Sequence, residues 1–174
     1  MSRHFLAFAA STRAESLNKR LMARAVAVAE ATGAQVHILD YESLQAPLYL
    51  GETAPALPAG PARLSEALRN ADGLMIASPE HNWSMPASLK NLIDWLSLDP
   101  RAPLKGKRAL LMCASPSVRG GILGLQQLSV PLSHLGVHVY PHLIAMGNAE
   151  EQLASATSKD HDFLRSCVAD WVVS

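Results

Sequence analysis

The side chains best suited to bind an anion follow the first apolar run of the chain. His4–Ala10 predicts a strand, Asn18–Thr32 predicts a helix, and the segment between them reads Ala-Ser-Thr-Arg-Ala-Glu-Ser-Leu-Asn from position 10 to position 18. A helix start offers unpaired N–H groups and a partial positive charge. Hydroxyl, amide and guanidinium groups placed there can donate to phosphate oxygens. These donors are Ser11, Arg13, Ser16 and Asn18. The alternative is that the serines and the asparagine only cap the helix and that the arginine is solvated.

A second polar segment lies between an apolar run and an amphipathic helix. Gly73–Ser78 is almost continuously apolar, as expected for a strand covered on both faces. Pro86 suits the first turn of a helix, and the apolar residues that follow it have the spacing of one helix face. These residues are Leu89, Leu92, Ile93 and Leu96. The turn between strand and helix therefore presents its backbone N–H groups at the carboxyl end of a strand, where α/β folds bind ligands.

A third loop follows the predicted strand Lys107–Ser115 and reads Ala-Ser-Pro-Ser-Val-Arg-Gly-Gly from position 114 to position 121. Two consecutive glycines allow the close approach of a flat ligand. The candidate lining residues are Ser115, Ser117, Gly120 and Gly121. The alternative is an ordinary turn. Arg119 either meets the phosphate of a nicotinamide nucleotide or is solvated.

Strand and helix patterns alternate along the whole chain, which positions these loops. The other predicted elements are strands at Gln35–Asp40 and Val137–Met146, helices at Pro61–Ala71, Gly121–Leu135 and Ala149–Val173, and a long loop at Tyr41–Gly60. Pro131 implies a kink or a late end in its helix. Helix-length connections argue for a parallel sheet with helices on both faces. About five strands fit a flavodoxin-like α/β fold of order 2-1-3-4-5, with a ligand at the switch point between the first and third strands.

The first and third-strand loops carry the residues of a known family. Residues 77–95 resemble the SPEYN-x-S-x-PG-x-LKN-x-IDW signature of the NADPH-dependent FMN reductases, a family that includes quinone, chromate and azo-dye reductases. The first loop is similar to the family's G-S-x-R-x-x-S-x-N segment, and its four phosphate donors are in register. Three positions depart from the family pattern, since Ala10 and Ala87 stand in place of glycines and His81 stands in place of a tyrosine.

The resemblance implies a cofactor site and an activity. It implies an FMN phosphate on the first loop, where Leu17 belongs to the matched stretch, and an isoalloxazine ring beside the third-strand loop. The implied contacts there are Pro79, Glu80, His81, Asn82, Trp83 and Ser84. In the implied reaction, NADPH or NADH gives a hydride to FMN, and a small-molecule acceptor takes the electrons. The cofactor carries this chemistry, so no catalytic side chain is expected. The resemblance also implies a homodimer or homotetramer.

The composition limits the number of domains, the partners and the location that the sequence allows. The 174 residues are 49% hydrophobic and 17% charged, which predicts one domain over residues 1–174. Lys+Arg and Asp+Glu number 15 each, so nothing favours nucleic acid or an anionic membrane as a partner. No apolar run reaches the ~20 residues of a membrane span, and no signal peptide is apparent. A cytoplasmic protein is expected.

Neither the cysteines nor the histidines predict a metal site. Cys113 and Cys167 lie far apart without metal or redox spacing. His134, His138 and His142 recur every fourth residue, but they fall across a helix end and a strand. Two other functions stay open beside the reductase. One is a flavodoxin-like electron carrier, although such carriers are usually acidic. The other is a flavin-free binding or regulatory relative, which the three departures from the family pattern would suit.

Overall fold

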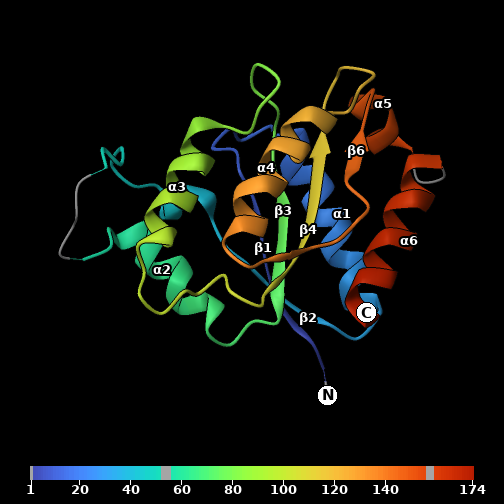
Figure 1. Cartoon of the computed structure of the whole chain (residues 1–174). Coiled ribbons are helices and arrows are strands. Elements are labelled where there is room, and N and C mark those ends of the chain that lie inside the picture. Colours follow the sequence, from blue (N-terminus) through green and yellow to red (C-terminus); the bar gives the residue numbers. More distant parts are fainter. Residues whose placement is uncertain (1, 52–55, 156–158) are drawn as a thin grey trace.

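A parallel β-sheet forms the centre of the computed structural model, which describes residues 2–51, 56–155 and 159–174 (Figure 1). Its strands are β1 (His4–Ala9), β2 (Gln35–Ile38), β3 (Gly73–Ala77), β4 (Arg108–Ala114), β5 (His138–Val139) and β6 (Ile144–Met146). They follow the order β2-β1-β3-β4-β5, and β6 also pairs with β4. Every strand pair is parallel. The predicted flavodoxin-like order is confirmed, with a sixth strand added.

Helices cover both faces of the sheet, as predicted. They are α1 (Leu17–Ala31), the 3-10 helix η1 (Tyr41–Leu44), α2 (Ala59–Leu68), α3 (Ala87–Ser97), α4 (Ile122–His134), α5 (Ala149–Ala154) and α6 (Lys159–Val173). Helices α1 and α6 lie on one face, and α2, α3 and α4 lie on the other (Figure 1). Because all the strands run the same way, their carboxyl ends share one edge, at the top of Figure 1.

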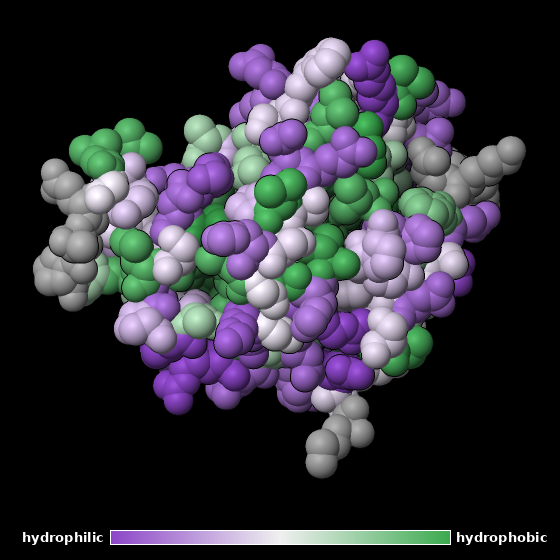
Figure 2. Space-filling view, in the orientation of Figure 1, coloured by the Kyte–Doolittle hydropathy of each residue, from purple (hydrophilic) through white to green (hydrophobic). Residues whose placement is uncertain are grey.

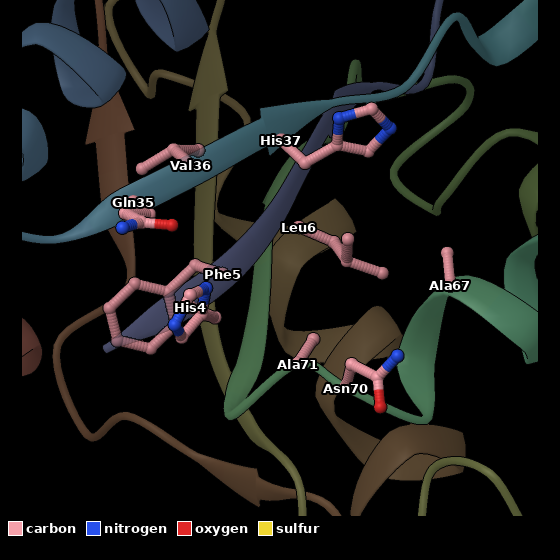
Figure 3. Close-up of a pocket in the computed structure, with 9 residues that line it drawn as sticks. All are labelled: His4, Phe5, Leu6, Gln35, Val36, His37, Ala67, Asn70 and Ala71. Atoms are coloured by element: carbon pink, nitrogen blue, oxygen red, sulfur yellow. The ribbon is translucent and has the colours of Figure 1, made fainter. Parts of the chain in front are cut away.

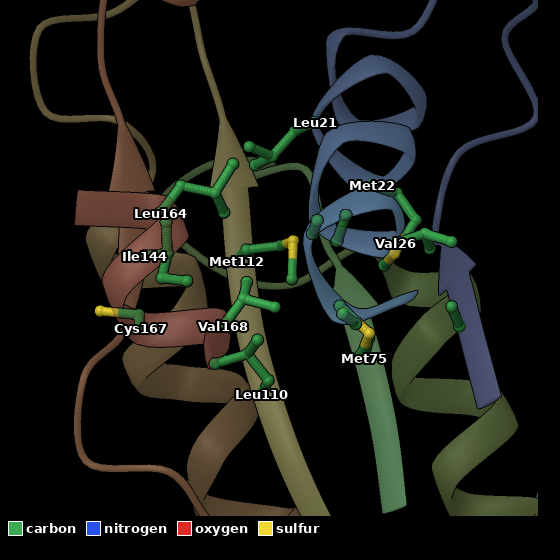
Figure 4. Packing of buried hydrophobic residues seen from close by; sticks show 14 of the residues in the cluster. Leu21, Met22, Val26, Met75, Leu110, Met112, Ile144, Leu164, Cys167 and Val168 are labelled. Carbon is green, nitrogen blue, oxygen red and sulfur yellow. The ribbon is translucent and has the colours of Figure 1, made fainter. Parts of the chain in front are cut away.

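The central strands are apolar throughout because each of their two faces packs against a helical layer. Alternate residues of β1 enter opposite cores: Phe5 packs toward α1 and α6, and Phe8 packs toward α2 and α3. In the first core, side chains of α1 and α6 close over β3, β4 and β6 (Figure 4). Leu164, Cys167, Val168 and Trp171 of the last helix all face inward, as its periodicity predicts.

Two long elements predicted near the C-terminus are each divided in the structure. The region Val137–Met146 holds two short strands, β5 along the first half of β4 and β6 along its second half. Pro141 lies between them, and proline cannot donate to a strand ladder. The region Ala149–Val173 holds α5 and α6, and residues 156–158 between these helices are outside the described part of the chain.

The segment predicted as one long loop, Tyr41–Gly60, is more ordered than expected. It contains η1, whose first turn is capped by Asp40 accepting from the Glu42 N–H at 3.3 Å. Helix α2 begins at Ala59, earlier than predicted. Residues 52–55 lie outside the described part. Helix α4 continues through Pro131 and ends at His134, so the predicted late end is confirmed.

The surface is largely hydrophilic, most clearly at the lower end of the view, near the amino ends of the strands (Figure 2). Hydrophobic side chains appear between the polar ones on the face shown. Within residues 2–51, 56–155 and 159–174, no helix combines the length and the apolar character needed to cross a membrane.

A buried carboxylate joins α2 to the segment that follows α3. Asp99 accepts from the Ser65 hydroxyl at 2.5 Å and from Arg101, whose Nη2 lies 2.8 Å from Oδ2. The backbone N–H of Arg101 also donates to Oδ1 at 3.0 Å. Hydrogen bonds to Arg101 lower the pKa of Asp99 well below its ordinary value, against the opposing effect of burial. The carboxylate therefore stays ionised in the folded protein at pH values where it would take up a proton in the unfolded chain.

Replacing this carboxylate should remove a pH-dependent part of the stability. A lowered folded-state pKa contributes stability that is present above the unfolded value of about 4 and is lost as the pH falls further. We expect Asp99→Asn to lower the free energy of unfolding by about 1–3 kcal/mol at pH 7 and by less at pH 3. Urea unfolding at both pH values measures this difference. The same loss at both values would contradict a role for the ionised form.

Candidate functional site

A cleft of about 500 Å³ opens at the carboxyl ends of β1, β3 and β4. It is lined by Ser11, Arg13, Glu15, Ser16, Leu17, Asn18, Arg20, Pro79, Glu80, His81, Ala114, Ser115, Pro116 and Glu150. The three loops singled out in the sequence therefore meet in one place, at the predicted switch point of the sheet. Nine of the predicted residues line the cleft, namely Ser11, Arg13, Ser16, Leu17, Asn18, Pro79, Glu80, His81 and Ser115. The other six, Asn82, Trp83, Ser84, Ser117, Gly120 and Gly121, are not among its lining residues.

The first loop is held in place by its own polar side chains. Ser16 is the N-cap of α1, and its hydroxyl accepts from the Lys19 N–H at 3.4 Å. Asn18 is buried, and its amide donates to Ala114 O at 3.0 Å and accepts from Ala114 N at 2.9 Å. These bonds join the start of α1 to the end of β4. Ser16 thus caps the helix and also lines the cleft, and Arg13 is exposed at the cleft.

Ala10 does not distort the loop that it begins. The Ala10 N–H donates to Ala77 O at 2.8 Å, which continues the pairing of β1 with β3. The four non-glycine residues with positive φ in the described chain do not include Ala10. The glycine of the family pattern is therefore not needed here for its backbone freedom.

The third-strand loop forms a tight hairpin beside the cleft. His81 and Ser84 exchange two backbone hydrogen bonds of 2.8 and 3.0 Å. The residues between them, Asn82 and Trp83, have φ values of 49° and 65°. Two successive positive φ values are typical of a type I′ turn. The turn leaves the Trp83 side chain 64% exposed at its tip, whereas Pro79, Glu80 and His81 line the cleft.

The two glycines of the loop after β4 allow this loop to pack closely against other parts of the chain. Gly120 and Gly121 have φ values of 64° and 80°. A Cβ on Gly120 would lie 2.5 Å from the Ala145 carbonyl, and one on Gly121 would lie 2.3 Å from Cys113 Sγ. Neither an ordinary turn nor a ligand alone explains this pair, because the space that each Cβ would need is filled by the chain itself.

Two side-chain contacts join the hairpin to the loop and helix after β4. Glu80 Oε2 accepts from the Gly124 N–H of α4 at 2.7 Å. At the tip of the hairpin, the Arg119 guanidinium lies over the Trp83 ring, 5.1 Å from its centroid. Sequence reasoning found neither contact, because each joins residues that are far apart in the chain. The pair of contacts fixes the relative position of the two loops.

Burial beneath these loops makes Cys113 unreactive. Burial, and then the nearby Glu80 carboxylate, raise the pKa of the thiol to about 12. A thiol with such a pKa is protonated at neutral pH and is a poor nucleophile. Cys113 therefore supports the loops by packing, as a small hydrophobic residue does.

Five residues of the cleft were not predicted, namely Glu15, Arg20, Ala114, Pro116 and Glu150. A signal existed for Arg20, which lies one helical turn after the N-cap Ser16 and so faces the same loop. Glu150 belongs to α5, whose place beside the cleft depends on the tertiary fold. The cleft is thus lined by two arginines, Arg13 and Arg20, and by three glutamates, Glu15, Glu80 and Glu150.

A second crevice, of about 410 Å³, lies at the opposite end of the sheet (Figure 3). It is lined by residues from the amino ends of β1 and β2 and from the turn after α2, including His4, His37 and Asn70. The two histidines point in different directions in the close-up. No group of three histidine, cysteine or acidic side chains in the described part of the chain is arranged to hold a metal ion.

A parallel sheet of this order, with an arginine-bearing loop beside a cleft at its switch point, defines a flavodoxin-like protein. The chain belongs to the NADPH-dependent FMN reductase family, whose pattern it matches over residues 4–151. FMN and a reduced nicotinamide are the cofactor and the electron donor of this family, as the resemblance implied.

Known relatives support the assignment. An NAD(P)H-dependent FMN reductase of Pseudomonas aeruginosa is 36% identical over 135 residues, which cover 76% of this chain and 71% of the relative. A quinone reductase of Escherichia coli is 50% identical over 64 residues, which cover 37% of this chain and only 34% of that protein. The structure of FerB, a flavoenzyme NAD(P)H:(acceptor) oxidoreductase from Paracoccus denitrificans, aligns with a TM-score of 0.79 and 27% identity, over 98% of this chain and 97% of FerB.

The cleft fits FMN. Its phosphate end offers two guanidinium groups and the hydroxyls of Ser11 and Ser16, at the start of α1. These are the donors that a phosphate monoester requires. The loop after β3 lines the cleft with Pro79, Glu80 and His81, and the loop after β4 lines it with Ser115 and Pro116.

Proposed function

We propose that this protein is an FMN-dependent NAD(P)H oxidoreductase, which passes electrons from a reduced nicotinamide to a quinone-like, azo, metal-oxyanion or flavin acceptor. The observation that carries the proposal is the single cleft in which the arginine-bearing first loop meets the loops after β3 and β4. The activities named for the relatives above point the same way, because each relative is an oxidoreductase that uses NAD(P)H or acts on a quinone.

The role of the protein in this reaction is to bind and orient. Bound FMN supplies the chemistry, because it accepts a hydride from the nicotinamide and gives electrons to the acceptor. Arg13 and Arg20 would neutralise its phosphate, and Ser11 and Ser16 would donate hydrogen bonds to it. The backbone of residues 79–81 and Ser115 would hold its ring. No side chain needs to act as a nucleophile or as a general base.

Steady-state kinetics test this function. The purified protein with FMN should oxidise NADPH or NADH continuously when a soluble quinone is present, and it should do so much more slowly without FMN. A flavodoxin-like carrier would bind FMN without this turnover, and a flavin-free relative would not bind it. The chain also lacks the net negative charge that is usual for such carriers, since Lys+Arg and Asp+Glu number 15 each.

We also propose that the protein assembles as a homodimer or homotetramer. Helix α3 does not supply an apolar contact surface at Trp95, because this side chain is only 8% exposed. The chain itself covers it, because Trp95 Nε1 donates to Pro47 O at 2.7 Å. Asn91 holds the same segment by accepting from the Tyr49 N–H at 2.8 Å. The covering segment presents Leu48 and Leu50, which are 72% and 75% exposed, and these supply the apolar surface.

Light scattering at micromolar concentration tests the assembly. The wild-type protein should have at least the mass of a dimer. Leu48→Glu with Leu50→Glu should shift the mass toward that of a monomer, because two charges would enter an apolar contact. Val173→Glu is the matched control, since it places a charge on another exposed apolar residue. A monomeric mass for the wild-type protein would contradict the proposal.

We further propose a cytoplasmic location and a single domain for the whole chain. The two cysteines support the location, because both are free and buried in the structure, and free cysteines are usual in a reducing compartment. The shared sheet supports the single domain, because its strands come from residues 4–146.

A further inference from the structure

Helix α4 begins without a cap of its own. Its N-cap residue is Gly121, which is in the left-handed region and has no side chain to accept from the first N–H groups of the helix. The first turn of a helix leaves such N–H groups without intrahelical partners. A serine, threonine, asparagine or aspartate normally accepts from one of them.

Glu80 supplies the missing acceptor from another loop. Its Oε2 lies 2.7 Å from the N–H of Gly124, which is the third residue of α4. This is the N–H that a capping side chain commonly binds. A carboxylate also suits the partial positive charge at the start of a helix. The cap is therefore provided across the structure, from the loop after β3 to the helix after β4.

The glycines of α4 are what allow Glu80 to reach this position. A Cβ on Gly124 would lie 3.2 Å from Glu80 Cβ, and one on Gly121 would lie 3.3 Å from it. A capping residue at position 121 is excluded as well, because its Cβ would be 2.3 Å from Cys113 Sγ. The loop after β3 thus packs against the start of α4 where Gly121 and Gly124 leave space, and Glu80 supplies the acceptor that Gly121 lacks.

We propose that Glu80 is a positioning residue that caps α4 and thereby holds the loops after β3 and β4 at the separation required by the FMN ring. Its negative charge also offsets the positive end of α4 beside that ring. The cap concerns the folded chain alone, whereas the loop separation required by the ring and the effect of the charge rest on the proposed function. The Glu80 carboxylate therefore acts through α4, while the backbone of the same residue lies in the loop that borders the cleft.

Two substitutions separate the hydrogen bond from the charge. Glu80→Gln keeps an oxygen that can accept from Gly124, whereas Glu80→Ala removes the acceptor. Without FMN, we expect Glu80→Ala to unfold at a clearly lower urea concentration than wild type and Glu80→Gln to stay close to it. With FMN, we expect Glu80→Ala to weaken binding at least about tenfold and Glu80→Gln by less than about threefold, given the usual effect of losing a cap.

The reduction potential of bound FMN reports on the charge. Because Glu80→Gln removes a negative charge near the ring, the anionic reduced form should gain about tenfold in binding relative to the oxidised form. For two electrons this corresponds to a potential about 30 mV more positive. Glu30→Gln, an exposed carboxylate near the far end of α1, is the control and should leave the potential unchanged.

The unfolding and FMN-binding measurements test the cap and the positioning role separately. Equal unfolding midpoints for wild type and Glu80→Ala would overturn the cap, and this measurement needs no cofactor. Normal FMN affinity in Glu80→Ala would overturn the positioning role. If wild type binds no FMN, the proposed function fails, while the unfolding comparison still decides whether Glu80 caps α4.

Discussion

Gly121→Ala should abolish tight FMN binding and lower the free energy of unfolding by about 2–4 kcal/mol. Two costs combine in this substitution. Alanine is disfavoured at a φ of 80°, and its Cβ would lie 2.3 Å from Cys113 Sγ. The loop cannot accommodate this atom without moving away from β4, and that movement would displace one wall of the cleft.

A matched control separates the two costs. Gly33 has a φ of 91°, but a Cβ there would meet nothing within 4 Å. Gly33→Ala should therefore cost only about 1 kcal/mol, from backbone strain, and leave FMN binding unchanged. Urea unfolding and FMN titration of both variants give the comparison. Equal losses in the two variants would show that the contact with Cys113 is unimportant.

The double variant Gly121→Ala with Cys113→Ala sharpens the test. Removing the sulfur opens space for the new methyl group, so the double variant should be more stable than the sum of the single effects predicts. The strain from the positive φ would remain. Purely additive effects would contradict the proposed close approach of Gly121 to Cys113.

Arg13→Ala should raise the dissociation constant of FMN about 10- to 100-fold, which corresponds to the loss of about 1.5–3 kcal/mol for a hydrogen bond to a charged group. The side chain is exposed at the phosphate end of the cleft. Riboflavin lacks the phosphate, so its weaker binding should be the same in the variant and the wild type. Fluorescence titration with both flavins measures the two constants.

Arg165→Ala is the control for this prediction, because Arg165 is exposed on α6 and is not a lining residue of the cleft. It should bind FMN as the wild type does. If Arg13→Ala also kept wild-type affinity, the first loop would not be a phosphate site. A loss shared by FMN and riboflavin would mean that Arg13 contacts the ring or supports the fold instead.

The sequence predicted the sheet and the meeting of the loops because these depend on local patterns. The apolar runs at β3 and β4 are typical of strands covered on both faces, and Ser16 lies where a helix must be capped. Parallel strands then bring the loops that follow them to one edge without further information. The position of the cleft followed from this rule, whereas the strand order followed from the fit of about five strands to a flavodoxin-like fold.

Long-range contacts could not be predicted in the same way. Asn18 appeared to be a free donor, but its amide is bound to Ala114, 96 positions away. Trp95 is covered by the segment at Pro47, and nothing in the sequence of its own helix indicates this partner. Glu80 lines the cleft as predicted, but its bond to a helix residue 44 positions later in the chain was not foreseen. In each case the partner is selected by the tertiary fold.

The division of the last strand region into β5 and β6 has a local signal in the sequence, which is Pro141. Pro141 interrupts the ladder between β5 and β6, as expected of a residue without an N–H donor. The contribution of Glu150 to the cleft had no such signal, since it depends on where α5 is placed after β6.

The visible absorption spectrum under anaerobic conditions tests the central claim most directly. The purified protein is mixed with one equivalent of FMN, freed of unbound flavin, and then treated with NADPH or NADH. We predict that the protein retains a yellow flavin spectrum, that the reduced nicotinamide bleaches it, and that a quinone restores it. A protein that retains no FMN, or whose bound FMN neither nicotinamide bleaches, would contradict the claim.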